Sequence, residues 1–254
     1  MADQMLQTSM ARLSSGNRIN SASDDAAGLA ISSSMTSQIN GMNQAISNSN
    51  DGISMAQTAD GALNEVTNML QRIRELAVQS SSGTYSDGDR ADMQAEVSQL
   101  TQQISSSLAN TTFNGVNLFN GSAGSSGVVN IQVGAQAGDV VGLNFSAISD
   151  TTTATSVATT TDAATAMATV DAQLKAINTA RAGLGAAESR MNSVVNSLTA
   201  NTTNLTDARS RISDTDFSAE TTNLAKAQIL SQAATAMLAQ ANQTPQGVLK
   251  LIQG

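Results

Sequence analysis

The sequence predicts a mainly α-helical protein, an elongated rod of long antiparallel, heptad-patterned helices with a small β-hairpin region at one end. Two observations predict this class. Apolar residues recur at heptad spacing through much of the chain, and aromatic residues make up only 2% of it. Aromatic side chains bury the largest area per residue and anchor most compact cores. A core with so few of them is better filled by Ala, Leu, Ile and Met between helices that pack along their length.

The first long helix is expected over residues 24–79. Ser21 and Asp24 have capping-box spacing, and Asp24 and Asp25 would lie in the first turn, where the helix dipole favours negative charge. Three glycines inside this helix, Gly41, Gly52 and Gly61, each cost helix stability and are expected where helices approach closely. The predicted apolar seam, spaced mostly by threes and fours, comprises Met35, Ile39, Met42, Ile46, Ile53, Leu63 and Leu70 and continues to Leu76.

A shorter helix and a β region are expected next. Met93, Val97, Leu100, Ile104 and Leu108 have helical spacing. The period then changes, because Asn-Gly pairs and the segments VVNIQV and VVGLNF are typical of hairpins. Residues 113–145 therefore predict a small β-hairpin region that caps the helices. The Thr- and Ser-rich residues 146–162 are expected to form an exposed connection.

The longest regular pattern lies in the C-terminal half. It predicts a helix over residues 164–212, because apolar residues recur every seventh position at Val170, Ile177, Leu184, Met191, Leu198, Leu205 and Ile212. The companion heptad position is interrupted by Arg181, Glu188, Thr202 and Arg209. A final helix carries Leu224 to Ala241, and Pro245 is expected to end or kink it.

These helices are longer than a compact molecule allows. The residues from Val170 to Ile212 would span about 63 Å, whereas a globule of this chain length is less than about 50 Å across. A rod with a thin core usually buries further surface against copies of itself or a partner. We expect three regions: a terminal helical region (1–20 and 215–254), a helical rod core (21–112 and 162–214), and the β region with its connection (113–161).

Composition excludes several classes of function. The chain has no His and no Cys, so a His-based catalytic triad and an imidazole or thiolate metal site are absent. A net charge of −8 with dispersed basic residues argues against nucleic acid as a partner. No apolar run is long enough to insert into a membrane. We expect no enzyme activity, no cofactor and no metal.

Two short motifs have a structural interpretation. The close carboxylates Asp87, Asp89 and Asp92 lack the bidentate Glu of a calcium loop, so helix capping is favoured. The same holds for Asp214 and Asp216. Ser and Thr in 151–161 are candidate O-glycan acceptors, although an unmodified linker is the favoured interpretation.

Several segments resemble bacterial flagellin, the subunit of the flagellar filament. They are RLSSGNRINSASDDAAGLAI (12–31), NDGISMAQTADGALNEVTNMLQRIRELAVQS (50–80), FNGVNLF (113–119), IQVGA (131–135), RSRISDTDFSAE and QILSQAATAMLAQANQTPQGVLKLI. The resemblance covers nearly the whole chain. It implies a self-assembling, secreted subunit of a motility filament, with terminal helices lining the inside. It also implies export through the flagellar apparatus with a chaperone, to an extracellular site.

The chain departs from that family in two respects. Flagellins usually begin about 15 to 20 residues earlier, so a missing start to the first helix is expected. Many flagellins carry large outer domains where this chain has only residues 146–162, which predicts a thin filament surface. A flagellin-like surface adhesin or a hook-filament junction protein remains an alternative.

The resemblance also implies a recognition site for the flagellin-sensing Toll-like receptor, an innate immune receptor. The family's Arg and Leu in LQRxRELAVQ match Arg72 and Leu76, and its Glu in the next helix matches Glu96. Arg72 and Leu76 are four residues apart and would share one helix face. The alternative is that Leu76 is core and Arg72 is an ion-pair partner.

Overall fold

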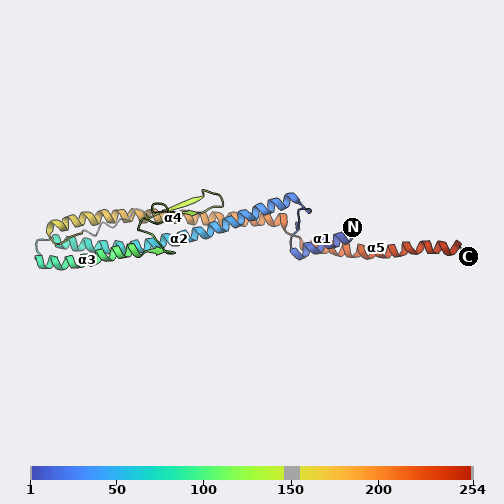
Figure 1. Cartoon of the computed structure of the whole chain (residues 1–254), viewed down its shortest axis with the longest axis horizontal. Coiled ribbons are helices and arrows are strands. Elements are labelled where there is room, and N and C mark those ends of the chain that lie inside the picture. The colour runs from blue at the N-terminus through green and yellow to red at the C-terminus, as the bar shows by residue number, and fades with distance from the viewer. Residues whose placement is uncertain (1, 146–154, 253–254) are drawn as a thin grey trace. The chain divides into compact units, whose positions relative to one another are not determined.

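The protein is mainly α-helical, as predicted. The structure, a computed structural model, describes residues 2–145 and 155–252, with side chains up to residue 241 (Figure 1). The helices are α1 (Ala2–Ser15), α2 (Ala26–Ser81), α3 (Asp87–Asn110), α4 (Thr160–Ser213) and α5 (Phe217–Ile252). The strands are β1 (Thr112–Phe113), β2 (Val116–Asn117), β3 (Val128–Gln132) and β4 (Val140–Asn144). Most of the expected connection 146–162 lies outside the described residues.

The chain forms two compact units. The first contains residues 1–40 and 201–254, and the second contains residues 41–200. The second unit therefore holds α3, all four strands and parts of α2 and α4. The first holds α1, α5 and the remaining parts of α2 and α4.

In the second unit, α2 lies between α3 and α4 with alternating direction. As residue numbers rise along α2, those of its partners on α4 fall, because Gln57 bonds Glu188 and Arg74 bonds Asp171. The core between the helices is aliphatic and is filled by the repeating apolar residues, as heptad packing requires. Fully buried members include Leu63, Leu70, Ile73, Val97, Ile104, Val170 and Met191.

The glycines of α2 have different environments. A Cβ on Gly52 would lie 2.8 Å from Met191 Sδ and 3.0 Å from Ile131 Cγ1, so close approach requires glycine there. Gly41 faces the β3–β4 loop at Ala135 and not another helix. Gly61 has open space around its Cβ position, so the expected close approach at that glycine is wrong.

The strands form two separate antiparallel pairs. β1 and β2 are joined by Asn114-Gly115, both with positive φ (49° and 79°), the geometry of a type I′ hairpin turn. β3 pairs with β4 from Val128↔Asn144 to Gln132↔Val140. Their apolar face packs against the helices, with Val141 and Leu143 buried. Phe119 and Phe145 meet edge to face, with ring centres 6.4 Å apart.

The β3–β4 hairpin was expected to cap the helices at one end. Instead it lies alongside the interior of α2, where Asn48 Nδ2 donates to Gln132 O and Ile131 lies over Gly52. A two-stranded sheet with one apolar face cannot bury that face on a helix tip. It needs the side of a helix, and glycine at position 52 provides the room.

In the first unit, α1 and α5 pack antiparallel, since Asp3 contacts Ser231 and Arg12 contacts Glu220. Arg18 ties the α1–α2 link to the end of α4. Its guanidinium donates to Ile212 O at 2.5 Å, and its backbone N–H donates to Ser213 O. Unpaired carbonyls at a helix C-terminus favour such a cation.

Two helix ends differ from expectation. Helix α2 begins at Ala26, and Asp25 is its cap because Asp25 Oδ1 accepts from Gly28 N at 2.9 Å. Asp24 lies before the helix and accepts from the backbone N–H of Asn20 and Ser21. Helix α5 continues through Pro245 to Ile252. A proline φ is compatible with a helix, and the loss is confined to one hydrogen bond and local strain.

Candidate functional site

The predicted recognition residues Arg72 and Glu96 form an exposed pair between α2 and α3. Arg72 Nε donates to Glu96 Oε1 at 2.7 Å and Nη2 donates to Oε2 at 3.3 Å, a bidentate contact. Arg72 Nη1 also reaches Glu75 Oε2 at 3.2 Å. These hydrogen bonds, first that to Glu96, raise the pKa of Arg72 above its ordinary value. About half of each side chain of the Arg72–Glu96 pair remains exposed, 49% and 44%.

Leu76 does not share that surface. It is 2% exposed and belongs to the core of the second unit. A step of four residues turns a helix by about 40° beyond a full turn, and here that rotation carries the side chain from the surface into the interior. The expectation that Arg72 and Leu76 share one helix face is therefore wrong, and the arrangement is that of the alternative, with Leu76 in the core and Arg72 in an ion pair. Receptor recognition at this surface stays a prediction.

The predicted seam residues fall into two groups. The buried members are Ile39, Met42, Leu63, Leu70, Val170, Ile177, Leu184 and Met191. The half-buried members are Met35, Ile46, Ile53, Leu198, Leu205 and Ile212. The seam thus fills the core between α2 and α4 within the chain, and only its half-buried members retain surface for a contact with another molecule.

Polar residues that interrupt the companion heptad position make side-chain contacts between α2 and α4. Arg181 forms a bidentate pair with Asp60, Glu188 accepts from Gln57 Nε2 at 2.8 Å, and Arg209 donates to Thr36 Oγ1 at 3.3 Å. They flank the seam and fix which residues of α2 and α4 face each other, as charges beside a coiled-coil seam do. The sequence contained the signal, since these residues have the same seven-residue spacing as the seam.

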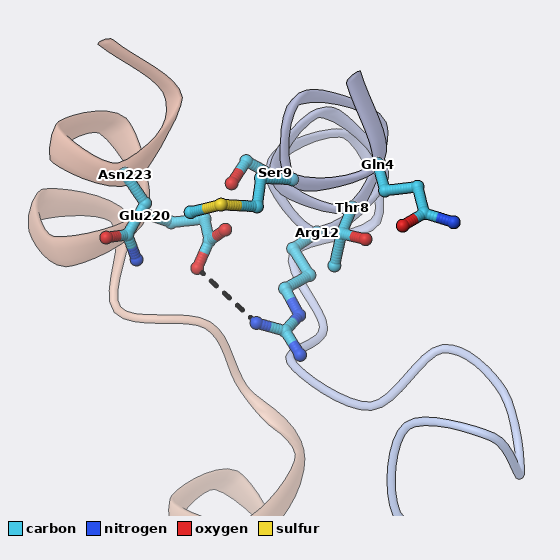
Figure 2. Close-up of a pocket in the computed structure, with 7 residues that line it drawn as sticks. Gln4, Thr8, Ser9, Arg12, Glu220 and Asn223 are labelled. Atoms are coloured by element: carbon cyan, nitrogen blue, oxygen red, sulfur yellow. Dashed lines mark ion pairs between the residues drawn. The ribbon is translucent and has the colours of Figure 1, made fainter. Parts of the chain in front are cut away.

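A pocket of about 360 Å³ lies between α1 and α5. Figure 2 shows the Arg12 guanidinium and the Glu220 carboxylate pointing toward each other across it. Their closest atoms are 3.8 Å apart, too far for a hydrogen bond. The remaining lining residues are Gln4, Met5, Thr8, Ser9 and Asn223. This pocket was not predicted, because no feature of the sequence pattern indicates that Arg12 faces Glu220.

One buried polar atom beside the pocket is unsatisfied. Arg12 Nε is buried and has no hydrogen-bond partner among the described residues. The Glu220 side chain is only 9% exposed, and Arg12 is its one ion-pair partner in the described part of the chain. Buried polar atoms without partners are uncommon in folded proteins and call for a physical explanation.

The first unit also exposes large apolar side chains. They lie on α1 and α5 and are Met5, Met10, Phe217, Ile229, Leu230, Met237 and Leu238, with Met237 71% exposed. Single exposed apolar residues are normal, whereas a large contiguous apolar patch marks an interaction surface.

Carboxylates of the chain cap helices. Ser86 and Asp89 form a capping box at the start of α3, and Asp216 Oδ1 accepts from the N–H groups of Ser218 and Ala219 at the start of α5. The capping interpretation holds for Asp89 and Asp216, whereas Asp214 accepts from the Ser210 and Ser213 hydroxyls at the end of α4. No group of three or more acidic residues suited to a metal ion occurs among the described residues.

Comparisons with known proteins identify the family. The "Bacterial flagellin N-terminal helical region" matches residues 2–124 and the "Bacterial flagellin C-terminal helical region" matches residues 167–252. The chain belongs to the bacterial flagellin family. Its resemblance to flagellin is thereby confirmed at both ends. Because flagellins are structural proteins, the chain is a structural protein and not an enzyme.

Individual flagellins are similar over most of their length. A flagellin of Halalkalibacterium halodurans is 44% identical over 97% of this chain and 92% of its own. The "Flagellar filament 31.3 kDa core protein" of Treponema maltophilum is 42% identical over 96% of this chain and 91% of its own. The crystal structure of Bacillus cereus flagellin matches with a TM-score of 0.52 and 27% identity, over 64% of this chain and 94% of that one.

The short form of this flagellin fits these comparisons. Phe145 ends the β region and α4 begins at Thr160, an interval too short for a large outer domain. No helix in the described ranges has the length and hydropathy needed to cross a membrane.

Proposed function

We propose that this flagellin is a structural subunit of a flagellar filament and assembles with copies of itself through coiled-coil-type helix packing. One observation carries the proposal beyond family membership. The α1–α5 pair leaves seven large apolar side chains exposed. Full burial of a fully exposed side chain of this size contributes about 1.5–3 kcal/mol, and covering these partly exposed side chains contributes a share of that amount each. A second copy of the chain is a partner that every filament subunit has.

The terminal region 1–20 with 215–254 is the inner part of the filament in this proposal. The exposed apolar side chains of α5 then line subunit contacts. Contacts between different surfaces of identical molecules generate open helical arrays when the rotation does not close a ring. A filament subunit therefore needs two different docking surfaces, and the half-buried seam residues Leu198, Leu205 and Ile212 supply a second apolar strip.

Export belongs to the same proposal. An extracellular subunit reaches the filament through the flagellar export apparatus, and a chaperone covers the exposed surface of α5 before assembly. The absence of Cys in the sequence supports passage of an unfolded chain, because no disulfide can form on the way.

Electron microscopy of purified protein tests the assembly. Protein incubated with a precipitating salt or with filament seeds is expected to form long filaments of uniform width. Ile229→Thr is expected to raise the concentration needed for assembly, because Ile229 is 66% exposed on α5. Val116→Thr is the matched control on β2, at 43% exposure. Protein that remains monomeric in every such condition contradicts the proposal.

A second function, recognition by the flagellin-sensing Toll-like receptor, is favoured by the exposed Arg72–Glu96 pair. The bidentate contact holds both charged groups in one orientation at the surface, so a partner meets a preorganised site. The proposed surface consists of Arg72, Glu96 and the backbone near Leu76, which the buried Leu76 side chain holds in place. Its test is given with the predictions below.

A further inference from the structure

Methionine sulfur is the side-chain atom of this chain that mild oxidants attack first. Cysteine and methionine are the residues that peroxides oxidise most readily, and the chain has 11 Met and no Cys. Trp and His are absent as well, and Tyr occurs once. Oxidation of the chain is therefore confined almost wholly to its thioethers.

Exposure separates the methionines of α1 and α5 from the rest. Met5, Met10 and Met237 are exposed, at 42%, 57% and 71%, and all three belong to the first unit. The other methionines with described side chains are buried or half-buried: Met35, Met42, Met55, Met69, Met93, Met167 and Met191. Because oxidation of a thioether requires access of the oxidant to sulfur, the susceptible sulfurs are those of the α1–α5 pair.

The exposed sulfurs lie where a change of polarity affects assembly. They share the α1–α5 pair with the exposed side chains of Phe217, Ile229, Leu230 and Leu238, which the proposed assembly covers with a second copy. A thioether is apolar, and its flexible side chain adapts to an apolar partner. A sulfoxide is polar, and its oxygen loses bound water without gaining a donor when an apolar partner covers it. Oxidation at these positions therefore opposes the contact between copies.

We propose that Met5, Met10 and Met237 are oxidation sites that control assembly, with a hydroperoxide as the oxidant. The sulfur gives an electron pair to one oxygen of hydrogen peroxide, so that the S–O bond forms as the O–O bond breaks. The hydroxide that leaves takes the proton of the transferred oxygen and departs as water. A subunit with these sulfoxides does not add to a filament, and a filament shields the same sulfurs. The inference rests on the proposed filament function.

Peptide mass spectrometry after graded treatment with hydrogen peroxide measures the accessibility of each sulfur. In soluble protein, Met10 and Met237 are expected to react at least about fivefold faster than Met191, which is 0% exposed. In preformed filaments, the three exposed sites are expected to react at least about fivefold more slowly than in soluble protein. Equal rates in either comparison overturn the inference.

The concentration needed for filament formation measures the consequence of oxidation. Soluble protein that is oxidised at the three exposed sites is expected to need at least about a tenfold higher concentration, with its helix content by circular dichroism unchanged. Treatment with methionine sulfoxide reductases for both sulfoxide stereoisomers is expected to restore assembly. Unchanged assembly of the oxidised protein, or no recovery after reduction, overturns the inference.

Two matched triple variants assign the effect to these positions. The exposed-site variant carries Met→Leu at the three exposed positions, which keeps the surface apolar and removes the sulfurs. Its assembly is expected to survive peroxide treatment. The control variant carries Met55→Leu, Met69→Leu and Met167→Leu, at half-buried positions of the second unit, and is expected to lose assembly as the natural chain does. The opposite result for either variant overturns the inference.

The untreated natural protein separates this inference from the filament function. Failure of that protein to form filaments overturns the proposed function and the inference together. Filament formation that peroxide does not affect overturns the inference alone. If the exposed-site variant assembles poorly before oxidation, the reductase treatment of oxidised natural protein decides between the two results, since recovery supports the inference and no recovery overturns it.

Discussion

Arg181 of α4 donates two hydrogen bonds to Asp60 of α2, from Nε to Oδ1 at 2.8 Å and from Nη2 to Oδ2 at 3.3 Å. The hydrogen bonds to Asp60 raise the pKa of Arg181 above its ordinary value. The contact lies beside the buried seam residue Leu184 and specifies the register of the two helices, since sliding α4 by one heptad would separate the pair.

Removal of this pair is expected to lower stability modestly. Arg181→Gln should cost about 0.5–1 kcal/mol of unfolding free energy in urea, because both side chains are partly exposed and solvent screens them. Arg190→Gln on the same helix is the control, since Arg190 has no ion pair among the described residues. A double-mutant cycle with Asp60→Asn isolates the pair, and a coupling energy of zero would contradict the assignment.

Arg90 is expected to matter far more. It is 6% exposed and donates to Ser80 O, Ser82 O and Tyr85 O, so one side chain closes the link between α2 and α3. Arg90→Met would leave three carbonyls without that donor and should cost about 3 kcal/mol or more in urea unfolding. Arg90→Lys should recover little of the loss, because an ammonium lacks the planar fork. Full recovery by Lys would refute this account.

Arg72 and Leu76, the two predicted receptor-contact residues of α2, should differ in how their substitution affects signalling and stability. Arg72→Ala is expected to weaken signalling by monomers without changing the urea midpoint appreciably, because Arg72 is exposed. Leu76→Ala removes a buried side chain and is expected to cost about 2–5 kcal/mol of stability. Signalling is therefore compared at equal folded fraction, measured by circular dichroism.

Glu96→Gln provides a further variant for the same assay, since it preserves shape and weakens the charge-assisted contact with Arg72. Undiminished signalling by both Arg72→Ala and Glu96→Gln would exclude this surface.

Stability is expected to fall in acid. Hydrogen bonds from the Ser86 backbone and side chain lower the pKa of Asp89 below its ordinary value of 3.8. A carboxyl with a lowered folded-state pKa contributes its stabilisation above the unfolded-state value, and loses it as pH falls through the folded-state pKa. The pKa of Asp24 is also lowered, by hydrogen bonds from Asn20 and then Ser21. Hydrogen bonds from Arg74 and from Ser210 likewise lower the pKa of Asp171 and of Asp214.

Urea unfolding between pH 7 and pH 2 measures this effect. The unfolding free energy should be nearly level above about pH 5 and decline below about pH 4. Asp89→Asn should make that decline in unfolding free energy shallower. Asp92→Asn should leave the decline unchanged, because the carboxylate of Asp92 has no hydrogen bond in the described structure. Equal effects of the two substitutions would argue against the capping box as a source of the pH dependence.

Two glycines of α2 should respond oppositely to alanine. Gly61→Ala is expected to stabilise the protein by up to about 1 kcal/mol, because the added methyl group meets open space and lowers the entropy of the unfolded chain. Gly52→Ala should destabilise it, because the methyl group would press on Met191 and Ile131. Thermal unfolding of both variants gives the comparison. The same sign of change at both positions would contradict the packing described.

Local patterns in the sequence determined the fold class and the seams. The spacing of Val170, Ile177, Leu184 and Met191 was sufficient to predict one face of α4, and all four are buried. The Asn114-Gly115 pair was sufficient to predict a hairpin turn, because few residues tolerate two successive positive φ angles. The helix face and the hairpin turn depend on residues that are close in the chain, so the sequence alone predicts them.

Only the tertiary structure decided which residues reach the surface and which distant residues meet. Leu76 and Arg72 share a helix and a family motif, yet Leu76 is buried in the core and Arg72 remains half exposed. The Arg12–Glu220 pocket joins residues from opposite ends of the chain. Heptad spacing specifies a helix face but not what covers it, since burial depends on the position of neighbouring helices and on contacts between residues remote in sequence.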